Sequence, residues 1–469
     1  MRLFLCATIL LLLGIDVFNI DLTFATGSGL SAKNAILYML IVFLLLRMVV
    51  TRTGSFDARP VHLAWGVLMG YAILTWVIAG VLIGYDRYDL VESAIRLKSG
   101  LVDFYIFFLV FFLGTRSLDD TTTITRTLLF AAVFANFMTV LDTSGVLDLG
   151  YIEREDGRAQ GALGESNQYA AFIILTLPAI IATAVATHGL RRLFWFGGIM
   201  ISAIALMMTA SRGALVGALI AGIVGAHLYR RYWSVGRLAV WIVASFVVLA
   251  ILLTVSQSDQ LLAERVLNQT GSIDLSDASS GRSEIWTDAI AHMLQSPITL
   301  FTGYGWDVYA SFPFRFAPHN HYLGLWFNLG LIGLACGIFV LYYGIRRARQ
   351  ASELAQPPHR GLLIGFAIGA IALCTAIFFV DLHQPWAYFW LYAGVSLRMA
   401  LLVEQERKVQ AGVRELQRAA PEAKGPLSSG SRPGLAAAPA GRFGRRPAEA
   451  APVSDAHGWT STHRGRSAR

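Results

Sequence analysis

Apolar stretches long enough to cross a bilayer recur along most of the chain, and they constrain its fold more than any other feature. An α-helix needs about 20 apolar residues to span the hydrocarbon core, where it satisfies its own backbone hydrogen bonds. Of the 469 residues, 55% are hydrophobic and only 14% are charged, whereas soluble domains carry about 25% charged residues. The sequence therefore predicts an all-α polytopic membrane protein with about 12 transmembrane helices. The predicted spans are 3–20, 34–50, 62–83, 100–114, 124–141, 168–187, 193–210, 213–229, 238–255, 321–345, 361–380 and 385–403.

Basic residues concentrate in every second turn between the predicted spans, and this bias sets the expected orientation. If the N-terminus lies in the cytoplasm, these turns and the C-terminus also lie inside. The long loop 256–320, between the ninth and tenth spans, then lies on the outer, periplasmic face. The arginines expected inside are Arg47, Arg52, Arg59, Arg116, Arg191, Arg192, Arg230, Arg231, Arg237, Arg346, Arg347 and Arg349.

Composition divides the chain into two parts. Residues 1–405 hold all the predicted spans and form a transmembrane domain, whereas residues 406–469 are rich in Ala, Gly, Pro, Ser and Arg. A segment of that composition buries too little apolar surface to offset the entropy of ordering, so we predict a disordered, basic cytoplasmic tail. Its basic residues either rest on anionic lipid or have no role. The net charge of +8 follows from the tail and the membrane topology and does not indicate nucleic-acid binding.

The long loop contains signals for a helix and a turn. Ser279 or Ser280 can cap a helix over 282–296, and Pro297 helps to end it. The apolar side chains of this helix recur at helical spacing and are expected to lie on the bundle or on the membrane surface. Further on, the segment 303–305 (Gly-Tyr-Gly) predicts a flexible turn. The apolar stripe consists of Trp286, Ile290 and Leu294.

Polar side chains cluster where the long loop meets the apolar run 321–345. His319, Asn320 and His321 are consecutive there, at the mouth of a predicted membrane helix. A neutral imidazole accepts a proton near neutral pH, so a histidine at this position is a candidate general base. The alternative is that the three residues only cap the helix.

Several basic residues fall on the side of the membrane that should lack them. Guanidinium groups bind phosphate through two parallel hydrogen bonds and keep their charge, so a cluster near the outer leaflet suits a lipid pyrophosphate. The alternative is that each pairs with a nearby acid, although Arg212 has no acidic neighbour in sequence. These residues are Arg87, Arg96 and Lys98 after the third span, Arg154 and Arg158 after the fifth, Arg212 between the seventh and eighth, and Arg265, Arg282 and Arg315 in the long loop.

Two further polar groups have less specific signals. Asp381 and His383 fall in the short turn before the last predicted span, on the same side as His319. They can orient a base or a substrate, or simply belong to an exposed turn. Asn167 and Gln168 stand at the head of the sixth span, where a capping role is sufficient to explain them.

Four short motifs, taken in order, resemble those of the bacterial O-antigen ligase family, whose superfamily also contains O-antigen polymerases. The first three are Ser-Arg-Gly-Ala at 211–214, Gly281-Arg282 with Trp286, and Gly-Tyr-Gly at 303–305. In the fourth, His319-Asn320 is followed by nine residues, then Gly330, two residues and Gly333. The likeness covers roughly 150–400, and the first five spans match only in hydropathy.

The resemblance implies a metal-independent membrane glycosyltransferase of the GT-C-like type, without a cofactor, in the bacterial inner membrane. Such enzymes take a glycan from undecaprenyl pyrophosphate at the periplasmic face of the bilayer. Ligases pass it to a sugar hydroxyl of lipid A–core, and polymerases pass it to another lipid-linked glycan, as in O-antigen or exopolysaccharide synthesis. By motif position, His319 is expected to be the general base, and Arg212 and Arg282 to hold the pyrophosphate. Further candidate site residues are Asn320, His321, Asp381, Arg158, Arg265 and Arg315.

A transporter is the alternative from a different class of protein. Transporters place ionisable residues or broken helices near the middle of the membrane. The predicted spans are nearly free of charge, and Asp16 and Asp103 fall near predicted span ends. The polar candidates instead gather at one interface, which favours chemistry at the outer face. Between ligase and polymerase, the spacing of the histidine motif favours the ligase.

Overall fold

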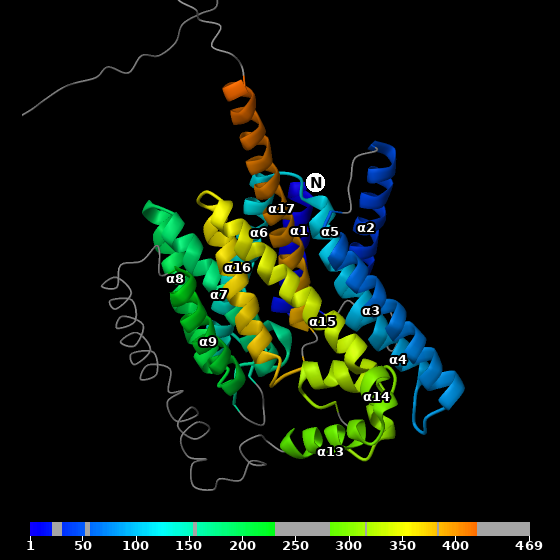
Figure 1. The fold of residues 1–469 in the computed structure, drawn as a ribbon. Helices are drawn as coiled ribbons and strands as arrows, with labels where there is room; N and C mark the ends of the chain where they lie inside the picture. The colour runs from blue at the N-terminus through cyan, green and yellow to red at the C-terminus, as the bar shows by residue number, and fades with distance from the viewer. Residues whose placement is uncertain are drawn as a thin grey trace, which may run out of the picture. The chain divides into compact units, whose positions relative to one another are not determined.

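Helices account for nearly all the regular structure in the computed structural model (Figure 1), which describes residues 1–20, 31–51, 57–152, 157–229, 282–314, 317–381 and 384–419. Residues Met1–Val413 form one compact unit, and Arg414–Arg469 form a second. The described α-helices are α1 (Arg2–Val17), α2 (Ala32–Thr51), α3 (Arg59–Val77), α4 (Leu90–Leu97), α5 (Asp103–Gly114), α6 (Leu118–Thr143), α7 (Ser166–Ala186), α8 (Gly189–Met208), α9 (Arg212–Tyr229), α13 (Arg282–Leu294), α14 (Pro297–Thr302), α15 (His321–Leu354), α16 (His359–Ala376) and α17 (Gln384–Ala419).

The prediction of an all-helical, multi-pass membrane protein is confirmed, but the number of spans is not. Within the described ranges, eight helices are long and apolar enough to cross a membrane, fewer than the twelve predicted. Helix α1 has only 16 residues, α9 is also short, and α17 is more polar. The predicted span 238–255 lies outside the described residues. The eight candidate spans are Ala32–Val50, Arg59–Ile83, Leu90–Gly114, Leu118–Thr143, Ser166–Ala186, Gly189–Met208, His321–Leu354 and His359–Ala376.

The fourth span was predicted to begin at residue 100, which is too late. Helix α4 starts at Leu90 and continues through the π-helical segment Lys98–Val102 into α5, which gives one span that ends at Gly114. Arg96 and Lys98 therefore lie inside a helix and not in a turn, and Asp103 is not near a span end. The charged residues kept the first part of this helix out of the predicted span. In the structure, Lys98 Nζ lies 3.0 Å from an Asp103 carboxylate oxygen, so the two charges neutralise each other within the bundle.

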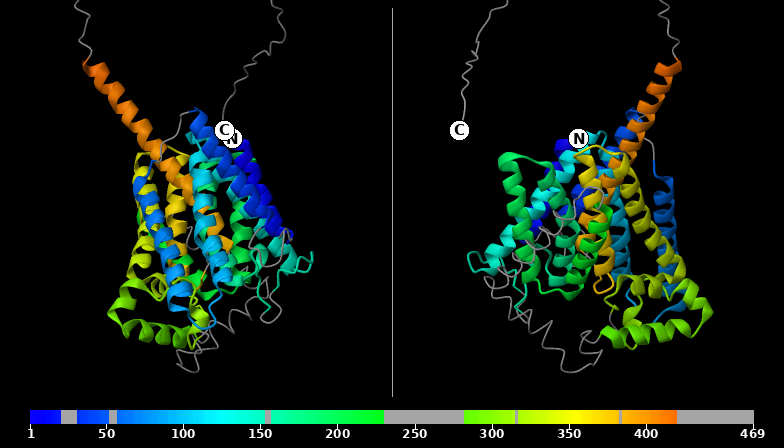
Figure 2. Two further views of the ribbon diagram at one scale, coloured as in Figure 1. Left: turned by 90° about the vertical axis from the view of Figure 1, so that its right-hand side faces the viewer. Right: turned by 60° about the vertical axis from the view of Figure 1, so that its left-hand side comes forward.

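The chain passes back and forth between two ends of the bundle (Figure 2). We call the end at which α15 begins the His319 end, and the opposite one the Arg2 end. At the His319 end, Tyr388 near the start of α17 donates a hydrogen bond to Asp16 near the end of α1. At the Arg2 end, Arg2 pairs with Asp119 at the start of α6. Helices α13 and α14 lie across the His319 end (Figures 1 and 2), so the described part of the long loop covers it.

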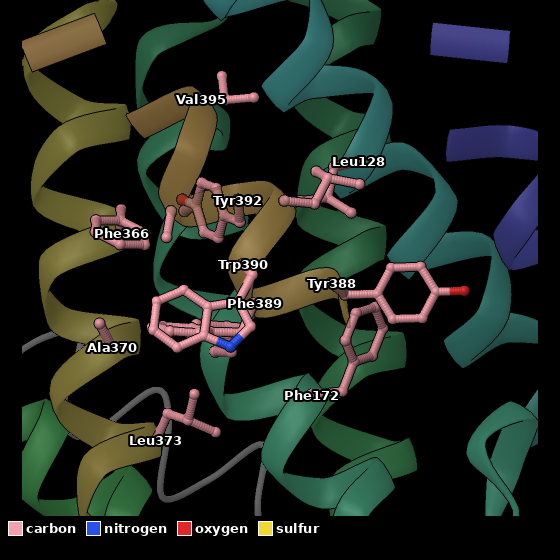
Figure 3. Close-up of a cluster of buried hydrophobic side chains, with 14 of the residues drawn as sticks. Leu128, Phe172, Phe366, Ala370, Leu373, Tyr388, Phe389, Trp390, Tyr392 and Val395 are labelled. Atoms are coloured by element: carbon pink, nitrogen blue, oxygen red, sulfur yellow. The ribbon is translucent and has the colours of Figure 1, made fainter. Parts of the chain in front are cut away.

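The core fixes the helices that carry the polar candidates. Helices α7 and α16 approach so closely that a Cβ added to Gly369 would lie 2.0 Å from the Leu175 carbonyl oxygen. The segment of α17 from Tyr388 to Val395 lies in a cluster of buried hydrophobic side chains, several of them aromatic (Figure 3). There the ring centroids of Tyr388 and Phe172 are 5.4 Å apart, and the Tyr392 ring packs edge-on against the Phe366 ring. Tight packing of this kind leaves the side chains little room to move, so the ends of α16 and α17 are held in place.

Aromatic side chains attach the loop to the first half of the bundle. Tyr71 on α3 donates a hydrogen bond of 2.7 Å to the Thr302 carbonyl. In the turn after α3, Tyr85 donates to Tyr304 O at 3.1 Å and Tyr88 donates to Trp306 O at 2.7 Å. Three phenols thus donate to three carbonyl groups of the loop backbone and attach it to the bundle.

The sequence predicted a flexible turn at 303–305. In the structure, the backbone of this segment makes close contacts with the backbone of α15. The Tyr304 amide donates to Phe327 O at 2.9 Å, and the Gly305 amide donates to Asn328 O at 3.0 Å. Gly330 interrupts α15 there with a left-handed φ of 61°, and a Cβ on it would lie 2.1 Å from the Phe301 carbonyl oxygen. The loop amides therefore donate to carbonyl groups of α15 that lose their helical partners at the Gly330 break.

We expect Gly330→Ala to destabilise the protein by about 3 kcal/mol, because the new methyl group meets backbone and the left-handed φ is unfavourable for alanine. Thermal unfolding of the detergent-purified protein should show a clearly lower midpoint. Gly344→Ala on the same helix is the matched control, since nothing lies within 4 Å of an added Cβ there. Equal midpoints for the two variants would contradict this account of the helix break.

The last described helix extends past the boundary predicted at residue 405. Helix α17 continues to Ala419, so residues 406–419, which were predicted to be disordered, are helical. The reason is local, because this stretch is rich in Glu, Gln, Arg and Ala, which are strong helix formers. Residues 420–469 of the predicted tail lie outside the described residues.

Candidate functional site

The three polar residues at the head of α15 have different roles in the structure. Asn320 is the N-cap of the helix, and its side chain accepts a hydrogen bond of 3.0 Å from the Leu323 amide. His319 precedes it, is exposed, and has a left-handed φ of 48°. His321 is the first helical residue, and its amide donates to Ile377 O at 2.9 Å. The capping role therefore falls to Asn320, which places one histidine on each side of the cap.

Asp381 pairs with His321 at the head of α15. The Asp381 carboxylate lies 3.2 Å from His321 Nδ1, and the two side chains are 23% and 22% exposed. A carboxylate at one ring nitrogen fixes the orientation of an imidazole. Asp381 is thus placed to orient His321.

Asp381 also lies near an acid and a phenol of the long loop, Asp307 and Tyr309. Burial raises the pKa of Asp307, whereas the neighbouring Arg96 lowers it and the charge of Asp381 raises it further. Burial also raises the pKa of the Tyr309 phenol, and the charge of Asp381 adds to this. Tyr309 donates a hydrogen bond of 3.0 Å to Gly324 O in the first turn of α15. The negative side of the site therefore faces the loop segment 307–309.

Helix α13 presents Arg282 and Trp286 on one face, since residues four apart in an α-helix lie on the same side. The Trp286 indole donates to Pro318 O, next to His319, and the Arg282 guanidinium donates to Phe379 O. This face shares only Trp286 with the predicted apolar stripe, which was expected to lie on the bundle or on the membrane surface. Ala289 and Met293 are fully buried with it, whereas Ile290 and Leu294 are exposed by 37% and 62%. The small Ala289 allows a close approach that the larger apolar side chains do not.

Arg212 begins α9, directly after the break that separates it from α8. A Cβ on Gly213 would lie 2.9 Å from the Phe379 Cβ, so the start of α9 packs on the same residue that accepts from Arg282. Burial lowers the pKa of Arg282, the charge of Glu165 opposes this effect, and the charge of Arg212 lowers the pKa further. The two arginines, far apart in sequence, are therefore close enough for their charges to repel each other, and Glu165 offsets part of that repulsion.

Arg158 supports the turn before Arg212. It is only 7% exposed, its Nε donates to Thr209 O at 2.9 Å, and its terminal nitrogen donates to Asn167 Oδ1 at 3.1 Å. The same Asn167 oxygen accepts from Ser211 Oγ at 2.9 Å. Asn167 thus joins Arg158 to the turn, although the sequence indicated only a helix cap. These contacts give Arg158 a positioning role for α9.

The segment 377–381, between α16 and α17, joins all these parts and was missed in the sequence analysis. Ile377 O accepts from His321, Phe379 contacts the starts of both α9 and α13, and Asp381 pairs with His321. Backbone carbonyls and an apolar ring supply most of these contacts, so only Asp381 gave a signal in the sequence. Glu165 was likewise missed as the acid that acts on Arg282.

Other predicted residues fall elsewhere. Arg265, Arg315, Arg154 and His383 lie outside the described residues. Arg87 is in an exposed turn after α3, as predicted. Within the described ranges, no group of three or more His, Cys, Asp or Glu side chains could hold a metal ion.

Comparison with known families agrees with the motifs. Residues 197–338 match the family model described as O-antigen ligase, whereas a search among curated proteins gives no match. The matched segment includes Arg212, Arg282, the Gly-Tyr-Gly contact and the head of α15 as far as Gly333, so the described contacts join residues from all four motifs. This match supports the resemblance of the segment to the O-antigen ligase and polymerase superfamily.

Proposed function

We propose that this protein is an O-antigen ligase that moves a glycan from undecaprenyl pyrophosphate to a sugar hydroxyl of lipid A–core. One observation carries the proposal. Arg282 and the start of α9, where Arg212 lies, both contact Phe379, within the segment 377–381 that also holds the head of α15. Two fixed positive charges and a histidine pair at one end of a membrane bundle suit a reaction in which a pyrophosphate leaves and a hydroxyl attacks.

The chemistry assigns one role to each group. The acceptor oxygen attacks the anomeric carbon of the donor sugar, and the bond from that carbon to the pyrophosphate oxygen breaks. His319 takes the proton of the attacking hydroxyl. Arg212 and Arg282 hold the pyrophosphate and stabilise the negative charge that it gains as it leaves. No metal ion is needed for this charge stabilisation if both guanidinium groups face the phosphates.

His321 and Asp381 complete the proposed site by positioning its base. The contact between their side chains, together with the bond from the His321 amide to Ile377 O, fixes the head of α15 against the segment 377–381. The Asn320 cap then sets the backbone next to His319. The left-handed backbone of His319 costs about 1 kcal/mol, which a functional position tolerates more readily than a structural one.

The proposal also assigns the two ends of the bundle to the two sides of the inner membrane. The His319 end faces the periplasm, and the Arg2 end, with both termini, faces the cytoplasm. The positive-inside rule supports this, because Arg59, Arg116, Arg191 and Arg347 are at or near helix ends at the Arg2 end. A lipid-linked donor then reaches the arginines from the outer leaflet.

Deletion of the gene is the experiment that tests the reaction. We expect lipopolysaccharide gels to lose all long-chain material while the lipid-linked polymer accumulates, because the transfer step is missing. A polymerase of the same superfamily uses the same donor and would instead leave core with a single repeat unit. An unchanged gel with loss of capsule or slime would identify an exopolysaccharide polymerase and contradict the ligase.

A further inference from the structure

A second site lies at the Arg2 end, on the opposite side of the bundle from His319. A cavity of about 620 Å³ opens there between the start of α3, the end of α15 and the middle of α17. This volume is within the range of small-ligand sites, about 300–1,000 Å³. The charged residues in its lining are Asp57, Arg59, Arg347, Glu404 and Lys408.

The acids in this lining are already neutralised. Glu404 pairs with Arg347 at 2.6 Å, and Asp57 pairs at 3.1 Å with Arg398, which lies outside the lining. Arg59 and Lys408 are exposed at the cavity with no acidic partner among the described residues. The cavity therefore keeps two uncompensated positive charges, which indicates a negatively charged ligand.

Two unsatisfied groups point to the same kind of ligand. The Nε of Arg347 is buried without a hydrogen-bond partner among the described residues, although its terminal nitrogen is bonded to Glu404. Helix α3 begins at the cavity, its N-cap is Ala58, and no side chain caps it. The dipole at the start of an uncapped helix favours an anion, although Pro60 has no N–H and the Val61 amide already donates to Ala58 O. A phosphate group, with its charge and its acceptor oxygens, fits such a position beside Arg59 and Lys408.

The outer face of α3 suggests where that phosphate comes from. Leu63 and Val67 follow Arg59 at intervals of four residues, so all three lie along one face of the helix. They are exposed by 70% and 44%, as expected for side chains that face lipid. A phospholipid with its headgroup at Arg59 can lay its acyl chains along this stripe.

We propose that this cavity binds the phosphate of an anionic phospholipid from the surrounding leaflet. The two unpaired cations and the dipole of α3 attract the headgroup, and the apolar stripe of α3 accepts the chains. This site is separate from the proposed glycan-transfer site, and neither depends on the other.

Lipid binding to the full-length protein in detergent tests the proposal, with phosphatidylglycerol as the probe and native mass spectrometry as the measurement. The double variant Arg59→Gln/Lys408→Gln should bind phosphatidylglycerol about 25-fold more weakly, at about five-fold for each charge near a headgroup. The charge-retaining variant Arg59→Lys/Lys408→Arg should recover most of the binding. Both residues are exposed, so neither exchange removes a buried contact.

The matched control is Arg116→Gln/Arg349→Gln, which removes two exposed charges outside the cavity lining. Equal weakening in both double variants would overturn the proposal, because surface charge alone would then explain the binding. Glycerol 3-phosphate serves as a soluble competitor that carries the same phosphate group without acyl chains. If it displaces the lipid from the wild-type protein at a similar concentration, the phosphate comes from a soluble ligand and the lipid assignment is wrong. Transfer activity is not measured, so failure here leaves the proposed reaction untouched.

Discussion

Exchange of His319 for alanine should slow glycan transfer by about 1,000-fold, within the range that a general base contributes. The acceptor hydroxyl then has no group to take its proton as it attacks. His319 is exposed, so the loss of its side chain removes little packing. Turnover of purified lipid-linked glycan by the detergent-solubilised variant measures the effect, and wild-type turnover would refute the assignment.

The backbone at position 319 provides a sharper variant. Alanine is strained at a φ of 48°, whereas asparagine tolerates this region well. His319→Asn should therefore keep the thermal midpoint and lose activity as fully as His319→Ala. His321→Ala and Asp381→Asn separate the two histidines, since a positioning pair should cost only about ten-fold. A larger loss in His321→Ala than in His319→Asn would make His321 the base.

Exchange of Arg212 for lysine should reduce turnover by about 100-fold, the cost of removing one well-placed donor to a developing negative charge. Lysine keeps the charge but loses the two parallel hydrogen bonds that guanidinium makes to phosphate. Arg212 is the better position to test, because Arg282 also holds Phe379 O and its exchange would disturb the site backbone.

The control for this prediction is Arg87→Lys, in an exposed turn at the same end of the bundle. It makes the same chemical change and should leave turnover within two-fold, since surface substitutions away from a site have small effects. If Arg212→Lys retains full activity as well, Arg212 serves the start of α9 and not the pyrophosphate. The double variant Arg212→Lys/Arg282→Lys should lose less than the product of the single losses, since both arginines are proposed to bind one group.

The sequence predicted the helical bundle because apolar runs are local signals. It also predicted the break before Arg212 and the helix that begins at Arg282, and both are confirmed. It failed where the contact between two charged side chains determines whether a helix can continue through them. Lys98 and Asp103 looked like markers of a helix end, but each neutralises the other inside one helix.

The site shows the same limit more clearly. The motifs named Arg212, Arg282 and His319, but nothing in the sequence indicated that Phe379 lies between the two arginine-bearing helices. A phenylalanine in an apolar run gives no sign of a functional contact, and its carbonyl gives none at all. The apolar stripe of α13 also did not indicate that Ala289 is buried, because hydropathy favours large side chains.

The interruption of α15 at Gly330 has a mechanical consequence for catalysis. Residues 321–329 form a short rod with His319 at its tip, and the far end of this rod is attached to loop backbone at Tyr304 and Gly305. Under the proposed function, a displacement of that stretch of loop therefore reaches the proposed base through about two and a half turns of helix.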